Sequence, residues 1–147
     1  MYMLDTNIWI DILRGNLQPA FDIMRSCAPS QFKVPAIVVA ELYYGAEHSA
    51  HPQENYRIAE RLIAPYEIIP FDARCARVYA RINNELNSRG ARIGHYDALI
   101  AATAIAHEAI LVTNNYREFS RINGLRLESW YDISDIWAET GKAEVSE

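Results

Sequence analysis

The sequence has no apolar run close to the roughly 18 residues that a membrane-spanning helix needs. Its two cysteines, Cys27 and Cys75, lie far apart and form no CxxC pair, so we expect them to be reduced. Asp5 stands where a signal peptide would have its basic and apolar regions, so no signal peptide is expected. These absences argue against a membrane protein and a disulfide-stapled secreted domain, and they indicate a cytoplasmic protein.

Lysine is also scarce, with only Lys33 and Lys142 in the chain. Residues 1–131 carry 13 Lys+Arg and 14 Asp+Glu, whereas residues 132–147 carry one lysine and five acids. Most of the net charge of −5 therefore belongs to the C-terminal tail, and the rest of the chain is almost neutral. This balance neither supports nor excludes a nucleic-acid substrate.

Half of the 147 residues are apolar and 11% are aromatic, which is typical of one globular domain with a substantial core. Short apolar segments at 2–4, near 34, and at 66–70, 109–113 and 125–127 alternate with segments of helical periodicity. Residues 30–33 are expected to form a loop. Strands that alternate with helices predict right-handed crossovers, and hence a three-layer α/β/α domain with about five parallel strands. We expect this domain to span residues 1–131, and residues 132–147 to form an acidic, partly disordered tail.

An acid follows directly on the first short strand, at Asp5, before the polar residues Thr6 and Asn7. Ligands in open α/β sheets bind beyond the carboxyl ends of the strands, often against a helix N-terminus. The alternative is that one of these three residues simply caps the helix that follows.

Glu41 is the only charged side chain between Val34 and Ala46. Burying an unpaired carboxylate is costly, so we expect Glu41 to be enclosed and to be protonated, paired or bound to a metal. The alternative to a functional role is a buried ion pair with an arginine.

Two further acids follow later in the chain. Asp97 lies in the first turn of an alanine-rich helix, where the helix dipole favours an anion, although acids are common there without a functional role. Glu118 follows the predicted strand at 109–113, after Asn114 and Asn115, which can equally be ordinary turn residues.

These four acids are expected to meet at one edge of the sheet, because the carboxyl ends of parallel strands point the same way. Clustered carboxylates repel and raise one another's pKa, and a hard divalent cation such as Mg²⁺ or Mn²⁺ relieves that repulsion. A cation held in this way can polarise a phosphoryl oxygen and lower the pKa of a bound water. The pattern therefore indicates metal-dependent hydrolysis of phosphodiester bonds.

Four segments resemble the signature blocks of PIN-domain ribonucleases, and more closely those of the VapC toxins of bacterial toxin–antitoxin pairs. They are MLDTN at 3–7, VAELYYGA at 39–46, IGHYDALIAA at 93–102 and LVTNN at 111–115. The resemblance continues through REF at 117–119 and LRLESW at 125–130, in the order that the family has them. It implies a PIN-like fold and a magnesium-dependent endoribonuclease that acts as a toxin and whose metal-activated water attacks the RNA phosphate.

The same resemblance assigns roles to individual residues. Asp5, Glu41 and Asp97 match the family's acidic positions and would be catalytic and metal-binding. Many members carry a fourth aspartate near Asn114 or Asn115, where this chain has amides, so we transfer that catalytic role to Glu118. The supporting residues would be Thr6, Asn7 and Asn114.

Partners also follow from the resemblance, namely a homodimer, an RNA substrate such as tRNA, and a VapB-like antitoxin. Residues 43–44 and the helix from Arg57 are the expected protein contacts. Arg89 and Arg92 precede Asp97 and are candidates for phosphate contacts. Tyr43, Tyr44 and Tyr96 can stack on bases, although packing in the core or in a dimer is the better explanation of these residues.

Two other functions are open. A haloacid-dehalogenase-like phosphatase would use Asp5 as a covalent nucleophile, but such enzymes carry a second aspartate where this chain has Asn7. They also need a downstream lysine, and this chain offers only Lys33 and Lys142. A PIN fold kept only as a binding module is the other alternative, and the retention of four carboxyl groups argues against it.

Overall fold

The computed structural model describes residues 1–16 and 18–130. The expected tail at 132–147 lies outside the described residues, so the predicted domain boundary remains a prediction. Five strands form one sheet: β1 (Tyr2–Leu4), β2 (Phe32–Pro35), β3 (Glu67–Ile69), β4 (Ile110–Val112) and β5 (Arg126–Glu128). The helices are α1 (Thr6–Leu13), α2 (Gln18–Ser26), α3 (Ala36–Glu47), α4 (Pro52–Ile63), α5 (Ala73–Ser88), α6 (His95–Ala106) and α7 (Tyr116–Phe119), with a short 3-10 helix η1 (Pro29–Gln31).

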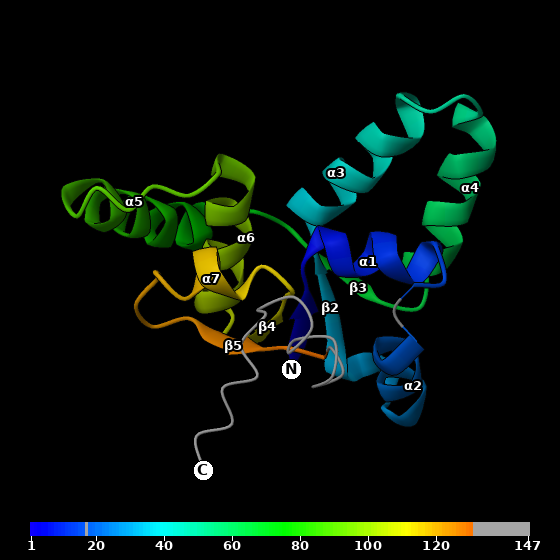
Figure 1. The fold of residues 1–147 in the computed structure, drawn as a ribbon, viewed down its shortest axis with the longest axis horizontal. Coiled ribbons are helices and arrows are strands. Elements are labelled where there is room, and N and C mark those ends of the chain that lie inside the picture. Colours follow the sequence, from blue (N-terminus) through cyan, green and yellow to red (C-terminus); the bar gives the residue numbers. More distant parts are fainter. Residues whose placement is uncertain (17, 131–147) are drawn as a thin grey trace, which may run out of the picture.

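The sheet has the order β3-β2-β1-β4-β5, and every pair of neighbouring strands is parallel. The chain moves outward from β1 through β2 to β3 and then returns to the other side of β1 to form β4 and β5. Right-handed crossovers then place α1 to α4 on one face and α5 to α7 on the other. Figure 1 shows these two helical groups on opposite sides of the sheet. The predicted three-layer architecture with a five-stranded parallel sheet is therefore confirmed.

Helix boundaries follow local chemistry. The carboxylate of Asp72 accepts a hydrogen bond from the backbone N–H of Cys75 at 3.0 Å and so caps α5. Pro52 opens α4, where a missing N–H costs no helical hydrogen bond. Gly15 has a φ of +70° just beyond α1, a conformation that glycine adopts without the steric penalty of a Cβ. These local signals set where the helices begin and end.

The core lies between the sheet and both helical layers. Its largest fully buried side chains include Trp9, Phe32 and Phe119. Helix α6 buries five alanines, whose small side chains allow a helix to approach its neighbours closely. One expectation was wrong, because β2 begins at Phe32 instead of following a loop that extends to Lys33. The ammonium group of Lys33 bonds Glu67 on β3 at 2.6 Å, so a charged residue occupies a strand position.

Within the described residues, no helix is both long enough and apolar enough to cross a membrane. Cys27 and Cys75 are not joined by a disulfide in this structure, and their reduced state stays a prediction.

Candidate active site

The site begins at the switch point of the sheet, where β1 lies beside β4 and the connections leave in opposite directions. Asp5 follows β1 directly, and its backbone N–H donates to the carbonyl of Val112 on β4 at 2.9 Å. This hydrogen bond continues the sheet by one residue and holds Asp5 at the carboxyl edge. Its side chain is only 2% exposed, so the carboxylate is almost completely removed from water.

Both oxygens of the Asp5 carboxylate accept hydrogen bonds. Oδ1 accepts from the backbone N–H of Thr6 at 2.7 Å, which makes Asp5 the cap of α1. Oδ2 accepts from Oγ1 of Thr113, the residue after β4, at 3.0 Å. Burial raises the pKa of Asp5, the hydrogen bonds from Thr113 and Thr6 lower it, and the charge of Glu41 raises it. Asp5 is therefore a helix cap and also part of a group of interacting carboxylates, so the two interpretations of the sequence are compatible.

Glu41 lies on α3 and joins the same group through Thr6. Its Oε1 accepts a hydrogen bond from Oγ1 of Thr6 at 2.7 Å. The expectation that Glu41 is enclosed was wrong, because its side chain is only partly buried and lines an open pocket. Val38, Val39, Leu42 and Ala46 of α3 are buried, whereas Glu41 lies with the exposed Ala40 and Tyr44 on the part of the helix that borders solvent. The ion pairs found among the described residues, Lys33–Glu67 and Glu85–Arg89, do not include Glu41.

Asp97 enters from the opposite helical layer, in the first turn of α6. The pKa of Asp97 is raised from 3.8 to about 6, first by burial and then by the negative charges of Asp5, Glu118 and Glu41. An effect of three carboxylates on a fourth requires each of the three to lie within electrostatic range of Asp97. The structure therefore brings together acids from α3, α6, α7 and the end of β1.

Glu118 is positioned by the turn that follows β4. Its Oε2 accepts a hydrogen bond from Nδ2 of Asn115 at 3.1 Å, and the backbone N–H of Asn115 donates to Oγ1 of Thr113 at 3.0 Å. Because Thr113 also donates to Asp5, a continuous chain of hydrogen bonds joins Glu118 to Asp5. Asn115 therefore supports the site, and Asn114, whose supporting role stays a prediction, is exposed on the turn.

Two threonines outside the predicted catalytic set, Thr6 and Thr113, provide the hydrogen bonds that connect the carboxylates. Thr113 was missed by the sequence reasoning, although a threonine directly after a buried strand beside Asp5 was an available signal. Thr6 was expected to support the site, and it does so by contacting both Asp5 and Glu41. Asn7 is exposed on the first turn of α1.

The chemistry of this donor set fits a hard divalent cation, because all four side chains offer carboxylate oxygens. Burial contributes most to the raised pKa of Asp97, and the negative charges of Asp5, Glu118 and Glu41 add a repulsion that a cation would relieve. In the described part of the chain, no three His, Cys, Asp or Glu side chains are close enough to share one ion as they stand. Mg²⁺ does not need three protein side chains, since it commonly binds through one or two carboxylates and keeps several of its water ligands.

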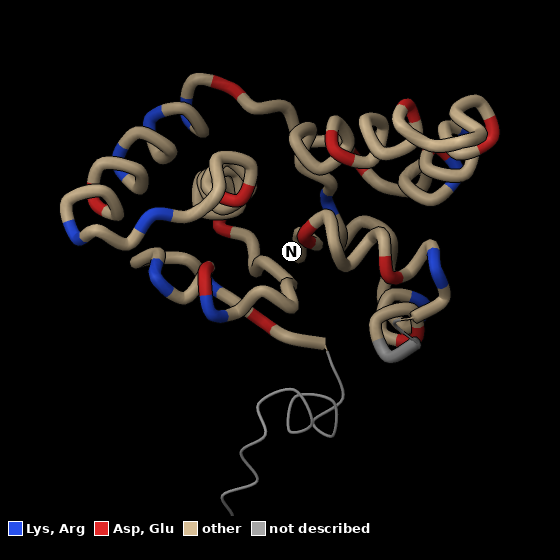
Figure 2. The backbone as a smooth tube through the Cα atoms, turned by 45° about the horizontal axis from the view of Figure 1, so that its top comes forward, with Lys and Arg blue, Asp and Glu red and all other residues tan. Residues whose placement is uncertain are grey.

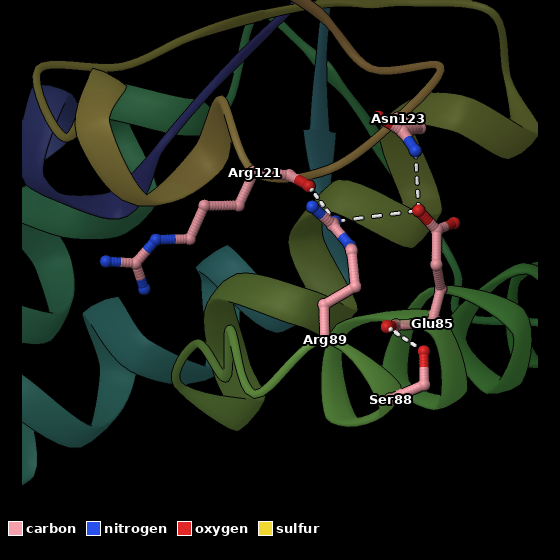
Figure 3. Close-up of polar contacts among 5 residues, drawn as sticks. All are labelled: Glu85, Ser88, Arg89, Arg121 and Asn123. Atoms are coloured by element: carbon pink, nitrogen blue, oxygen red, sulfur yellow. Dashed lines mark hydrogen bonds and ion pairs between the residues drawn. The ribbon is translucent and has the colours of Figure 1, made fainter.

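The two candidate arginines lie on the connection between α5 and α6. Figure 3 shows Arg89 directed at Glu85 and at the backbone carbonyl of Arg121, while the side chain of Arg121 points away from this cluster. The guanidinium of Arg121 in turn donates to the carbonyl of Arg92 at 3.1 Å. Arg89 thus ties the end of α5 to the segment after α7, and a phosphate contact would require it to leave these partners. Arg92 is exposed, and Figure 2 shows further basic positions along α5.

The fold and these carboxylates define a small α/β domain with an acidic site at the carboxyl edge of its sheet. The PIN domain family matches residues 2–125, so this chain belongs to the PIN-domain family and, as its relatives show, to the VapC ribonucleases within it. Ribonuclease VapC2 of Rickettsia felis is 38% identical over 131 residues, which are 88% of this chain and 98% of the relative. The tRNA(fMet)-specific endonuclease VapC of Salmonella typhimurium is 35% identical over 132 residues, 88% of this chain and 97% of the relative.

A solved structure agrees with this assignment. The crystal structure of VapBC2 from Rickettsia felis bound to a DNA fragment from its promoter superposes with a TM-score of 0.83 and 37% identity. The match covers 88% of this chain and 98% of that chain. The resemblance inferred from the four sequence blocks is therefore confirmed, and the phosphatase alternative is not supported.

Proposed function

We propose that this chain is a magnesium-dependent endoribonuclease that acts as the toxin of a VapBC-type pair in the cytoplasm, with tRNA as its substrate. The proposal rests on one observation above all, the hydrogen-bonded chain from Glu41 through Thr6, Asp5, Thr113 and Asn115 to Glu118. This series of hydrogen bonds fixes the orientation of three carboxylates that come from distant segments of the sequence. Relatives named as a ribonuclease and as a tRNA(fMet)-specific endonuclease support the substrate class.

Asp5 and Asp97 would hold the principal Mg²⁺, and Glu41 and Glu118 would complete the acidic surroundings. When bound, the metal would neutralise charge on the phosphate and lower the pKa of an attacking water. Thr6 and Thr113 favour the ionised form of the buried Asp5 carboxylate against the effect of burial and fix its direction, because each donates a hydrogen bond to it. The described residues thus provide orientation and negative charge, and the proposed hydrolysis does not require a covalent bond to Asp5.

A VapB-like antitoxin is the proposed partner, because similar chains have been solved as VapBC complexes. An apolar groove of about 400 Å³ between α1, α3 and α4 supports this proposal. Leu13 and Ile58 on its walls are partly exposed, and the groove reaches Glu41. A peptide lying there would reach Glu41 at the border of the acidic site. A homodimer remains a further expectation from the family.

The test compares the purified wild-type chain with Asp5→Asn and Asp97→Asn, using total tRNA and an unstructured mRNA transcript with Mg²⁺ or with a chelator. Asp72→Asn is a matched control, since it makes the same chemical change at an exposed helix cap and asparagine caps equally well. We expect Mg²⁺-dependent cleavage of tRNA by the wild type and the control, and little by the site variants.

Mapping of 5′ ends would identify the cut. Equal cleavage by wild-type and Asp97→Asn protein would remove the proposed mechanism. A chain that shows neither Mg²⁺ dependence nor RNA cleavage would be an inert binding module. Preferential cleavage of the mRNA would retain the nuclease but reject tRNA as its substrate.

A further inference from the structure

The structure separates the three candidate tyrosines into two groups. Tyr43 packs against Tyr56 of α4 with ring centroids 5.1 Å apart, so it belongs to the contact between α3 and α4. Tyr44 and Tyr96 are 70% and 59% exposed, which is unusual for large aromatic rings in a folded domain. Packing in the core therefore explains Tyr43 but leaves Tyr44 and Tyr96 without a role.

Both exposed tyrosines line one pocket beside the carboxylates. The pocket has a volume of about 530 Å³, and its lining residues are Ala40, Glu41, Tyr44 and Tyr96. Tyr44 lies three residues after Glu41 on α3, so the two side chains share one face of the helix. Tyr96 directly precedes Asp97 at the start of α6. The two rings thus approach the acidic site from opposite helical layers.

Tyr44 is supported on one side by a second ring. The imidazole of His48, one turn further along the chain, lies nearly parallel to the phenol ring, with an interplanar angle of 8° and centroids 5.9 Å apart. This stacking restricts the tyrosine rotamer, so less conformational entropy would be lost when a ligand covers the exposed face.

The charge of the pocket restricts what it can accept. Among the described residues that line it, Glu41 is charged and none is a lysine or an arginine, so these residues would not themselves hold a phosphate. A planar, uncharged aromatic group suits two exposed tyrosines, because stacking on aromatic side chains is the usual way in which proteins hold single-stranded bases.

We propose that Tyr44 and Tyr96 form a stacking subsite for one unpaired nucleobase of the RNA, adjacent to the phosphate that is cleaved. This inference rests on the proposed ribonuclease function and adds a requirement to it. A base within a duplex is covered by its neighbours, so the subsite selects cleavage positions at which the nucleotide is unstacked or easily extruded.

The experiment is a cycle of protein and RNA changes measured as kcat/KM. Two RNA substrates are compared. The first is a stem-loop that contains the mapped cut site, and the second is the same stem-loop with an abasic nucleotide next to that site. The proteins are the wild type, Tyr44→Ala, Tyr96→Ala, and the Tyr44→Phe and Tyr96→Phe variants that keep the ring. Phe21→Ala, which removes another exposed aromatic ring on α2, is the matched control.

We expect each alanine variant to lose about 10- to 100-fold in kcat/KM on the intact RNA. The phenylalanine variants and Phe21→Ala should stay close to the wild type. Removing the base should slow the wild type by a similar factor and should slow the alanine variants much less, because the stacking partner is already gone.

If removal of the base lowers kcat/KM by the same factor in the wild type and in the alanine variants, the stacking inference is wrong, although the proposed nuclease function still holds. Alanine variants that cleave normally but lose antitoxin binding or change their oligomeric state would also overturn it, assigning the tyrosines to a protein interface. Failure of the wild-type chain to cleave any RNA would overturn the proposed function and this subsite together.

Discussion

Replacing Asp97 by asparagine should stabilise the metal-free protein at neutral pH. In the folded protein the pKa of Asp97 is raised from 3.8 to about 6 by burial and by the charges of Asp5, Glu118 and Glu41. At about 1.4 kcal/mol per pKa unit, this shift corresponds to an upper limit of about 3 kcal/mol. Because the carboxylate is only partly buried, solvent screening reduces our expectation to about 1–2 kcal/mol.

The direction of the pH dependence follows from the raised pKa. The folded protein binds the Asp97 proton more tightly than the unfolded chain, so this contribution to stability is fully present below about pH 4. It is lost as the pH rises through about 6, when the folded carboxyl group must also ionise. Asparagine mimics the neutral form at every pH, so the variant does not suffer this loss.

The assay is thermal unfolding in the presence of a chelator across this pH range. We expect the Tm of Asp97→Asn to equal that of the wild type near pH 4, and to exceed it by about 2–8 °C above pH 7. Glu60→Gln removes an exposed carboxylate from α4 and is the control, for which we expect no difference. Adding Mg²⁺ should raise the Tm of the wild type more than that of Asp97→Asn, because an ion that binds only the folded state stabilises it.

One result would refute this reasoning. If Asp97→Asn melts at or below the wild-type temperature at neutral pH while Glu60→Gln is unchanged, the carboxylates do not repel one another in the folded protein. The acidic cluster would then be too dispersed to account for a metal site.

Three further outcomes are expected. Thr113→Val removes the hydroxyl that donates to Asp5 but keeps the side-chain shape, and should lower RNA cleavage about 10- to 100-fold in a steady-state assay. Asn115→Ala should lower cleavage, because the amide of Asn115 donates to the carboxylate of Glu118 on α7; an unchanged rate in the same assay would contradict this. Asp72→Ala should cost about 1 kcal/mol of stability in chemical denaturation through loss of the α5 cap, with cleavage unchanged, and an unaltered midpoint would show that the cap contributes nothing.

Several features of the fold were predictable from local sequence. The strand at Tyr2–Leu4, the cap at Asp72 and the alanine-rich helix after Gly94 depend on periodicity and capping, which act over a few residues. The start of β2 was not predictable in this way, because Lys33 looks like a loop residue. Its charge is tolerated in the strand only because Glu67 lies opposite it on β3.

The order of acidic segments along the chain was sufficient to indicate the family and the class of chemistry. The sequence could not show which polar groups orient the acids, since Thr113 and Asp5 lie 108 positions apart and meet only because β4 pairs with β1. For the same reason the sequence could not show that the amide of Asn115 contacts Glu118, nor that Glu41 borders solvent. Local propensity acts between neighbouring residues, whereas these contacts depend on strand order and register, which exist only once the whole sheet has formed.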